Sequence, residues 1–395
     1  MEKKKDYIFI LIMTFIRYLG DCFFYTFLYV FLMNRGLNES KIGLITCLFP
    51  LLALVSNPLW TRFIKNTNQN RKAMIVITIL EGLLIMVYSH IEIYEWFIVI
   101  SVMLGLIDSP FYYLHDGFCD TFASIYNKKY ANIRSMGTFG YLAATLIAAL
   151  VLYLTNDNYM LLFYISGICL ILTSVFFIWI KPINLSLISK EEKIKPNYKA
   201  VLKNKTFMVF LIVDFLIVGI SKSADNYVST FFTSEKNLSA SMWSLTFTLM
   251  LVFEMLTMFI TTKIKKINAN QAFIILGLTY LLRTLIYCFD LPLWLLVFLS
   301  LLRGVAFGIY LPTLVKALEE ILGIKNVTTG LFIVGTVEAV IRTIGVFTFG
   351  NLITYLGYKK FFLIVSLIIL LGNIINIIFS VKNRFKYPSV LEDIQ

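Results

Sequence analysis

Residues 7–33 read YIFILIMTFIRYLGDCFFYTFLYVFLM, an apolar run interrupted by a pair of opposite charges. A helix of about 20 residues crosses the hydrocarbon core of a bilayer, so this run predicts a membrane span. Arg17 and Asp21 lie four residues apart and share one face of that helix. A charge at the bilayer centre costs roughly 3 kcal/mol, and such residues usually face a protein interior along a substrate or ion pathway. The run therefore favours a transport protein over a simple membrane anchor.

The same combination of apolar sequence and isolated charge recurs along the chain. Hydrophobic residues make up 59% of the 395 residues and charged residues only 15%, which excludes an ordinary soluble domain. Twelve apolar runs have the length of a membrane span: 7–33, 40–61, 73–89, 95–122, 133–155, 159–181, 206–233, 240–262, 271–289, 292–318, 328–355 and 359–381. The charges inside them include Asp21, Asp116, Arg134, Asp225, Glu254, Arg283, Arg303, Glu338 and Arg342.

A polar segment divides these runs into two groups of six. Residues 182–205 hold several lysines and glutamates, and no other polar interruption of the chain is as long. Two six-span halves joined by a linker are typical of transporters built from repeats that enclose a midplane site. We therefore expect an all-α membrane protein with twelve transmembrane helices in two six-helix halves. The expected divisions are an N-terminal half at 1–182, a cytoplasmic linker at 183–205, a C-terminal half at 206–382 and a cytoplasmic tail at 383–395.

Positive charges fall mainly on alternate connections between the predicted spans. Because basic loops of multi-span proteins stay in the cytoplasm, we expect both termini to be cytoplasmic. The net charge of +12 then reflects membrane topology and not binding to nucleic acid. The first run is too long for a signal peptide and no small-residue cleavage site follows it, so we expect it to be retained. Richness in Lys, Asn and Ile suggests a bacterial inner membrane.

No motif indicates catalysis, a cofactor or a metal. The patterns GxxxxGK[ST], GxGxxG and HExxH do not occur in the sequence, which removes the usual nucleotide and zinc-peptidase signals. The five cysteines lie in separate apolar runs without CxxC spacing. We expect no enzyme activity, no cofactor and no metal site, and transport would then draw on an ion gradient or on that of the substrate.

Several intramembrane charges are spaced to neutralise one another. Asp116 and Arg134 lie on neighbouring antiparallel spans and could approach each other, and Arg303 with Glu338 repeats this arrangement with reversed signs in the second half. Asp116 and Asp120 are like charges one turn apart, so if both are buried at least one should hold a proton near neutral pH. Pairs three or four residues apart on one helix, which are equally consistent with local neutralisation, are Arg17 with Asp21, Lys222 with Asp225, and Glu338 with Arg342.

Tyrosines near these charges are candidates for substrate contact, because their rings stack on sugars and aromatic ligands and their hydroxyls form hydrogen bonds. With 22 tyrosines in the chain, most are expected to pack in the core or against lipid. Tyr141 carries more weight, because it follows Arg134 by two helical turns. Tyr25 is a second candidate.

The segment Asp116-Gly-Phe-Cys-Asp120, followed by Arg134-Ser-Met-Gly137-Thr-Phe-Gly140-Tyr141, resembles the lactose permease branch of the major facilitator superfamily. The phenylpropionate permease and nucleoside-proton symporter groups are similar, and the resemblance covers Tyr7 to Lys382. It implies that Asp116 and Arg134 hold substrate hydroxyls and that Tyr141 stacks on the substrate. Phe253-Glu254-Met-Leu and Leu282-Arg283-Thr resemble the family's helix 8 acidic motif and helix 9 arginine, which implies a role in proton coupling.

Two departures from the family pattern affect this interpretation. Arg303 stands where lactose permease has a histidine, and Ala306 stands where it has its proton-carrying glutamate. Proton coupling would then depend on Glu254, Glu338 or Asp116. The loop pattern G-x-x-x-D-[RK] is also degenerate, since it reads Thr61-Arg-Phe-Ile-Lys65-Asn66 here.

The sequence predicts a monomeric secondary transporter, a proton-coupled symporter of a small polar organic solute such as a sugar or oligosaccharide, a nucleoside or an aromatic acid. Two alternatives are an exporter of drugs or metabolites with the same fold and a non-transporting membrane sensor. The expected substrate-binding residues are Asp116, Arg134, Tyr141, Asp120 and Tyr25. The expected coupling and salt-bridge residues are Glu254, Arg283, Arg303, Glu338, Arg342, Asp21, Lys222 and Asp225.

Overall fold

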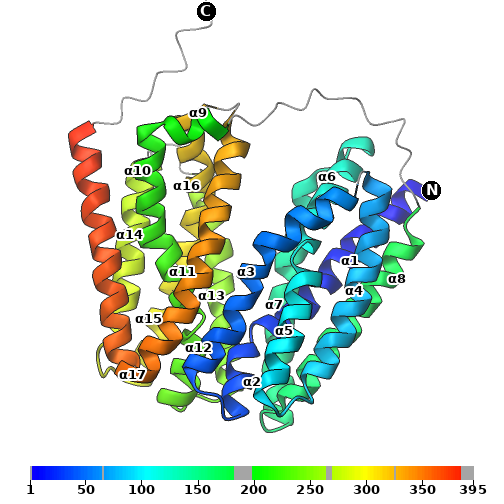
Figure 1. The fold of residues 1–395 in the computed structure, drawn as a ribbon, viewed down its shortest axis with the longest axis horizontal. Helices are drawn as coiled ribbons and strands as arrows, with labels where there is room; N and C mark the ends of the chain where they lie inside the picture. Colours follow the sequence, from blue (N-terminus) through cyan, green and yellow to red (C-terminus); the bar gives the residue numbers. More distant parts are fainter. Residues whose placement is uncertain (1, 65, 182–197, 264–268, 324–325, 384–395) are drawn as a thin grey trace, which may run out of the picture. The chain divides into compact units, whose positions relative to one another are not determined.

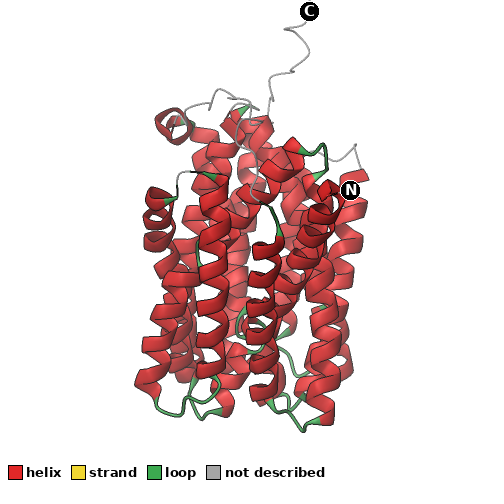
Figure 2. Cartoon of the chain, turned by 90° about the vertical axis from the view of Figure 1, so that its right-hand side faces the viewer, coloured by secondary structure: helices red, strands yellow, loops and turns green. Residues whose placement is uncertain are grey.

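A computed structural model describes residues 2–64, 66–181, 198–263, 269–323 and 326–383. Within these ranges the secondary structure is helical, and turns and short loops join the helices (Figure 2). Most of the predicted linker and the predicted tail from residue 384 onward lie outside the described residues, as does Lys65 of the loop pattern. The all-α prediction is confirmed for the part of the chain that is described.

The helices follow the predicted spans closely (Figure 1). In the first half they are α1 (Glu2–Tyr25), α2 (Leu28–Asn34), α3 (Glu39–Phe63), α4 (Thr67–Tyr88), α5 (Tyr94–Asp108), α6 (Phe111–Ile125), α7 (Tyr130–Leu154) and α8 (Tyr159–Trp179). They continue with α9 (Tyr198–Lys203), α10 (Lys205–Asp214), the π-helix η2 (Phe215–Gly219), α11 (Ile220–Asp225), α12 (Val228–Thr230), the π-helix η3 (Phe231–Glu235), α13 (Ala240–Lys263), α14 (Ala269–Ile286), α15 (Leu293–Ser300), α16 (Leu302–Leu322) and α17 (Val327–Asn383).

Asparagine side chains set several helix starts. The side chains of Asn38, Asn66, Asn158 and Asn204 each accept a hydrogen bond from a backbone N–H in the first turn of α3, α4, α8 and α10. An asparagine at this position satisfies one of the N–H groups that a helix start leaves without a partner.

Ten stretches of the described residues are long and apolar enough to cross a membrane. One of them, Val327–Phe379, contains two helices, because Gly357 inside α17 has a φ of 75° that ends the first and starts the second. The more polar helix α4 has 22 residues and the length of a span. With these two additions the described chain supplies the twelve predicted helices.

Four of the predicted spans are broken helices. Spans 1 and 7 break at 26–27 and 226–227, and spans 4 and 10 break at 109–110 and at Leu301. Pro110 explains the break in span 4, because proline lacks an N–H and its ring clashes with the preceding turn. The sequence around the other three breaks contains no proline or glycine at the break itself. The breaks recur at every third span and at corresponding places in the two groups of six.

The contacts divide the described residues into two compact units. Unit 1 draws on Met1–Glu191 and Tyr227–Thr248, and unit 2 on Glu192–Asn226 and Leu249–Gln395. The predicted boundaries of the two halves stay a prediction. In unit 1, α1 packs against α7 and α8, and α4 packs against α8. In unit 2, α14 packs against α16 and α17, and α11 packs against α17.

A close helix contact in unit 1 depends on glycine. A Cβ added to Gly82 on α4 would lie 2.7 Å from the carbonyl oxygen of Gly167 on α8. Small residues let helix backbones approach in membranes, where packing drives association. This contact fixes the position of Glu81, the neighbour of Gly82.

Candidate functional site

A buried ion cluster in unit 1 is centred on Arg17, whose side chain is fully buried. Its guanidinium donates to both oxygens of Glu81 on α4 and, at 2.7 Å, to Asp108 at the end of α5. Asp21 lies 3.1 Å away, so the predicted pair of Arg17 with Asp21 is confirmed. The guanidinium also lies 3.9 Å from the centre of the Phe111 ring. One cation thus contacts three carboxylates that come from three helices.

Two tyrosine hydroxyls complete what we call the unit 1 cluster. Tyr25, the last residue of α1, donates to Asp108 Oδ2 at 2.6 Å, and Tyr112 on α6 donates to Asp21 Oδ2 at 2.8 Å. Within the described part of the chain, Asp21 Oδ1 is buried and receives no hydrogen bond. Tyr25 was predicted to contact substrate. In the structure its hydroxyl forms a hydrogen bond with Asp108.

Asp116 and Arg134 are neighbours without forming an ion pair within 4.0 Å among the described residues. Asp116 is 3.4 Å from His115 Nδ1 and accepts a hydrogen bond from the Tyr130 hydroxyl. The Arg134 guanidinium lies 4.8 Å from the centre of the Tyr18 ring. The two charges interact electrostatically, as their spacing predicted, although each has its nearest contacts with other side chains.

The remaining predicted substrate residues of unit 1 differ in their surroundings. Tyr141 is half-buried, and its ring centre lies 6.1 Å from that of Tyr18. Tyr18 therefore joins Arg134 and Tyr141 into one group. Asp120 is exposed, and 43% of the Asp116 side chain is exposed as well. A proton near neutral pH was expected on one of them only if both acids were buried, and they are not. The structure thus gives no reason for a proton shared between these two acids.

The first ion cluster of unit 2 joins α11, α16 and α17. Lys222 Nζ donates to both oxygens of Glu338 at 2.8 and 3.0 Å, and the Tyr310 hydroxyl donates to Glu338 at 2.6 Å. Lys222 also lies 4.3 Å from the centre of the Tyr310 ring. Asp214 at the start of the π-helix η2 is buried and interacts with this group electrostatically. π-Helical turns occur often at functional sites.

The second ion cluster of unit 2 is built around Asp225, the last residue of α11. Asp225 forms an ion pair with the fully buried Arg283 on α14 and lies 3.4 Å from Arg303 Nε on α16. Glu254 on α13 interacts electrostatically with Arg303. Four of the predicted coupling residues therefore lie together.

Two predicted same-helix pairs in unit 2 are wrong. Lys222 contacts Glu338 on another helix instead of Asp225, and Glu338 does not contact Arg342. Arg342 is exposed and forms no ion pair with any described residue. The physical reason is that a same-helix pair contributes only a few tenths of a kcal/mol, whereas Asp225 faces the buried Arg283 and Lys222 faces Glu338 across packed helices.

Sequence reasoning did not single out Glu81, Asp108 and Asp214, although the same rule could have found them. Each is an acid inside an apolar run: ITILEGLLI, LGLIDSPFY and LIVDFLIV. An intramembrane acid indicates a functional site whether or not an opposite charge stands nearby in sequence.

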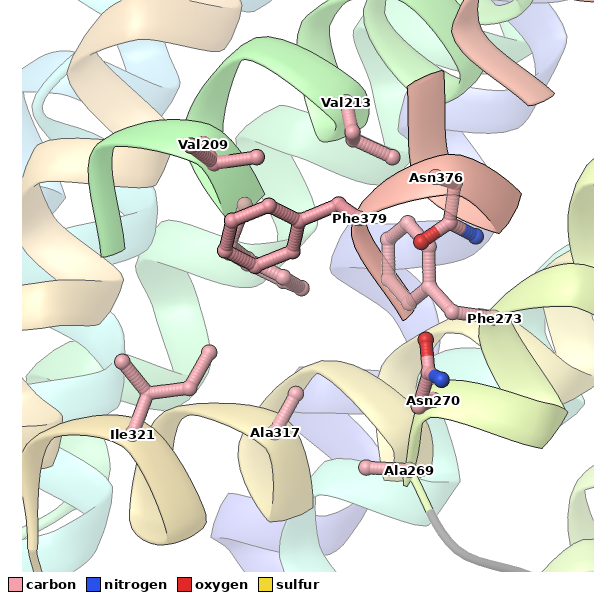
Figure 3. Close-up of a pocket in the computed structure, with 10 residues that line it drawn as sticks. Val209, Val213, Ala269, Asn270, Phe273, Ala317, Ile321, Asn376 and Phe379 are labelled. Atoms are coloured by element: carbon pink, nitrogen blue, oxygen red, sulfur yellow. The ribbon is translucent and has the colours of Figure 1, made fainter. Parts of the chain in front are cut away.

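A cavity in unit 2 lies between α10, α14, α16 and α17, away from both ion clusters (Figure 3). Its volume of about 20 Å³ is enough for roughly one water molecule. Figure 3 shows the amide side chains of Asn270 and Asn376 among mostly apolar neighbours. The cavity is too small for an organic solute.

Comparisons with known proteins agree on a family. Residues 8–364 match the model of the MFS_1 like family. The uncharacterized transporter YwbF of Bacillus subtilis (strain 168) is 24% identical over 295 residues, which cover 73% of this chain and 71% of YwbF.

Among solved structures, the nucleoside transporter NupG has a TM-score of 0.81 at 14% identity and covers 96% of this chain and 99% of NupG. A POT family transporter in complex with a thioalcohol-conjugated peptide has a TM-score of 0.73 at 10% identity, covering 95% of this chain and 96% of that one. At such low identity these matches show the fold alone. The family match confirms the resemblance to the major facilitator superfamily and supports transport of a small molecule by a multi-pass membrane protein. The chain belongs to the MFS_1 like family.

Proposed function

We propose that this protein is a proton-coupled symporter that takes up a small polar organic solute by alternating access. The observation that carries the proposal is the position of cluster residues, three charged residues and one tyrosine, at the breaks of the four interrupted spans. Tyr25, Asp108 and Asp225 end α1, α5 and α11, and Arg303 is the second residue of α16. Interrupted helices at corresponding places in two repeats are where secondary transporters bind substrate and coupling ions.

The buried charges themselves support coupling to an ion. Holding charges in the membrane interior costs several kcal/mol each unless they are paired, and replacing such a pair by apolar residues is often neutral or stabilising. A chain that served only as a scaffold would gain nothing from Arg17 with its acids or from Arg283 with Asp225. Ion pairs that open and close with proton binding give these residues a role in transport.

The group formed by Asp116, Arg134, Tyr141 and Tyr18 is the proposed substrate contact. It offers an acceptor, a cationic donor and two aromatic rings, a combination that suits a sugar, a nucleoside or an aromatic acid. Nucleosides are the class to test first, because NupG, which shares this fold, is a nucleoside transporter. Asp120 and Arg342 are exposed and rank below this group.

In this proposal the protein acts as a monomer in the cell membrane. Both termini lie in the cytoplasm, and the two six-helix halves comprise residues 1–182 and 206–382. The basic connections between the spans support this orientation. An exporter of the same fold is the alternative, and the direction of net flux separates the two.

The experiment is uptake into liposomes that contain the purified protein. Labelled nucleosides, sugars and aromatic acids are screened with and without an inward proton gradient, and with an inward sodium gradient in a third arm. We expect accumulation of one class that requires the proton gradient. Accumulation driven by sodium, or exchange that ignores both gradients, would replace the symporter by a sodium-coupled carrier or a facilitator.

A further inference from the structure

We propose that the coupling proton binds to the carboxylate of Asp21 in the unit 1 cluster; this inference rests on the proposed proton coupling. The sequence pointed instead to Glu254, Glu338 or Asp116 as the proton carrier. Charge balance and hydrogen bonding within unit 1 favour Asp21.

The charges of the unit 1 cluster do not balance. Three carboxylates, those of Asp21, Glu81 and Asp108, contact the single guanidinium of Arg17. Full ionisation would leave two negative charges without a cation, and no second Lys or Arg of the described chain forms an ion pair with these acids. An uncompensated buried charge costs several kcal/mol, and one bound proton removes one of these two charges.

Hydrogen bonding distinguishes Asp21 from the other two acids. Both oxygens of Glu81 receive guanidinium donors, and Asp108 receives Arg17 on one oxygen and the Tyr25 hydroxyl on the other. Asp21 receives the Tyr112 hydroxyl on Oδ2 only, although its side chain is fully buried. Oδ1 lies 3.1 Å from Arg17 without accepting a hydrogen bond. A proton is therefore least costly on Asp21, because Asp21 has the fewest hydrogen-bond donors of the three acids to give up.

A proton can reach Asp21 through its neighbours. Asp108 has 10% of its side chain exposed, and Tyr25 beside it is half-buried, so the cluster meets the surface of unit 1 at this end. When Asp21 is protonated, it no longer attracts the Arg17 guanidinium, which then contacts only Glu81 and Asp108. The position of Arg17 thus depends on the proton, which links proton binding to the hydrogen bonds that join α1 to α4 and α5.

Arg17 is the cation that pairs with Asp21 among the described residues; Arg134 on α7 and His115 on α6 lie beside the ring of Tyr18. The carboxylates that face it are Glu81 on α4 and Asp108 on α5. The other titratable groups near it are Tyr18, Cys22 and Tyr25 on α1 itself, Tyr112 on α6 and Tyr141 on α7, with the thiol of Cys169 on α8 beside Gly20.

Infrared spectroscopy of the purified protein in lipid tests the assignment without knowledge of the substrate. A protonated carboxylic acid has a carbonyl band that shifts in D₂O and vanishes as the pH rises. Asp214 is a second buried acid with an oxygen that is unpaired in the described chain, so the spectra are recorded in an Asp214→Asn background. We expect that background to show one band from a buried acid, and the added Asp21→Asn change to remove it. Glu81→Gln, Asp108→Asn and the exposed control Glu95→Gln should retain it. A band that persists in Asp21→Asn, or that disappears in Glu81→Gln or Asp108→Asn, overturns the assignment even if Asp21→Asn itself cannot be purified.

Transport of the solute identified by the uptake screen then separates this inference from the proposed function. Asp21→Asn resembles the protonated state, so it should still exchange labelled for unlabelled solute when the concentrations inside and outside are equal. It should no longer accumulate solute in response to the proton gradient. Glu95→Gln should accumulate like wild type. If wild type accumulates solute with the proton gradient and Asp21→Asn does so equally, only this inference fails. If wild type exchanges solute but ignores the gradient, the proposed function fails with it.

Discussion

Replacing Arg17 by methionine removes the guanidinium that holds the unit 1 cluster together while keeping a side chain of similar length. Asp21, Glu81 and Asp108 would then be left in the interior without their cation. Removing one partner of a buried ion pair destabilises a protein by about 3–5 kcal/mol, because the remaining charge stays desolvated. Since all three acids lose their cation, we expect a loss at the upper end of this range.

The assay is denaturant unfolding in detergent micelles, compared with Arg342→Met as the matched control. Arg342 is exposed and outside any ion pair of the described chain, so its replacement should change the free energy of unfolding by less than about 0.5 kcal/mol. The double variant Arg17→Met with Glu81→Gln should lose less stability than Arg17→Met alone, because one unpaired charge fewer remains. The loss should also shrink as the pH falls and the acids take up protons.

Equal stability of Arg17→Met and Arg342→Met would refute this reasoning. So would a double variant that is less stable than Arg17→Met. Either result would mean that the carboxylates find other partners when Arg17 is removed.

Three further predictions concern the rest of the molecule. Tyr310→Phe removes a hydroxyl that donates to Glu338 at 2.6 Å and should cost about 1.5–3 kcal/mol of unfolding free energy; an unchanged denaturation midpoint would contradict this. Gly304→Val places a side chain against the backbone of α13 and should cost about 1–3 kcal/mol, whereas Gly335→Val, where a Cβ meets open space, should be tolerated; equal thermal midpoints would contradict the close contact. Arg134→Ala should raise the solute concentration for half-maximal exchange by about tenfold, the equivalent of about 1.4 kcal/mol, and an unchanged value would remove Arg134 from the substrate contact.

The positions of the spans could be predicted because the length of an apolar run, about 20 residues, is read directly from the sequence. The break in α17 was also predictable, since Gly357 falls between two apolar runs and adopts a conformation that favours glycine. The breaks after Tyr25, after Asp225 and at Leu301 were not, because their sequences contain none of the residues that usually interrupt a helix.

The charged residues were predictable individually, but most of their partners were not. The partners of Arg17 lie 4, 64 and 91 residues away in sequence, and only the nearest, Asp21, could be inferred from helical spacing. For Lys222, helical spacing suggested a wrong partner, Asp225. The structure pairs Lys222 with Glu338, which is far away in sequence and lies on another helix. An ion pair between two helices depends on which of their faces pack together, and this cannot be read from an apolar run in the sequence.

Proton movement caused by the solute itself tests the proposal of coupled transport most directly. Liposomes containing the protein enclose a pH-sensitive dye, no gradient is imposed, and the solute identified in the uptake screen is added outside. We predict acidification of the interior that starts with solute addition, because each solute molecule enters with a proton. Uptake of labelled solute without any change in internal pH would contradict proton-coupled transport.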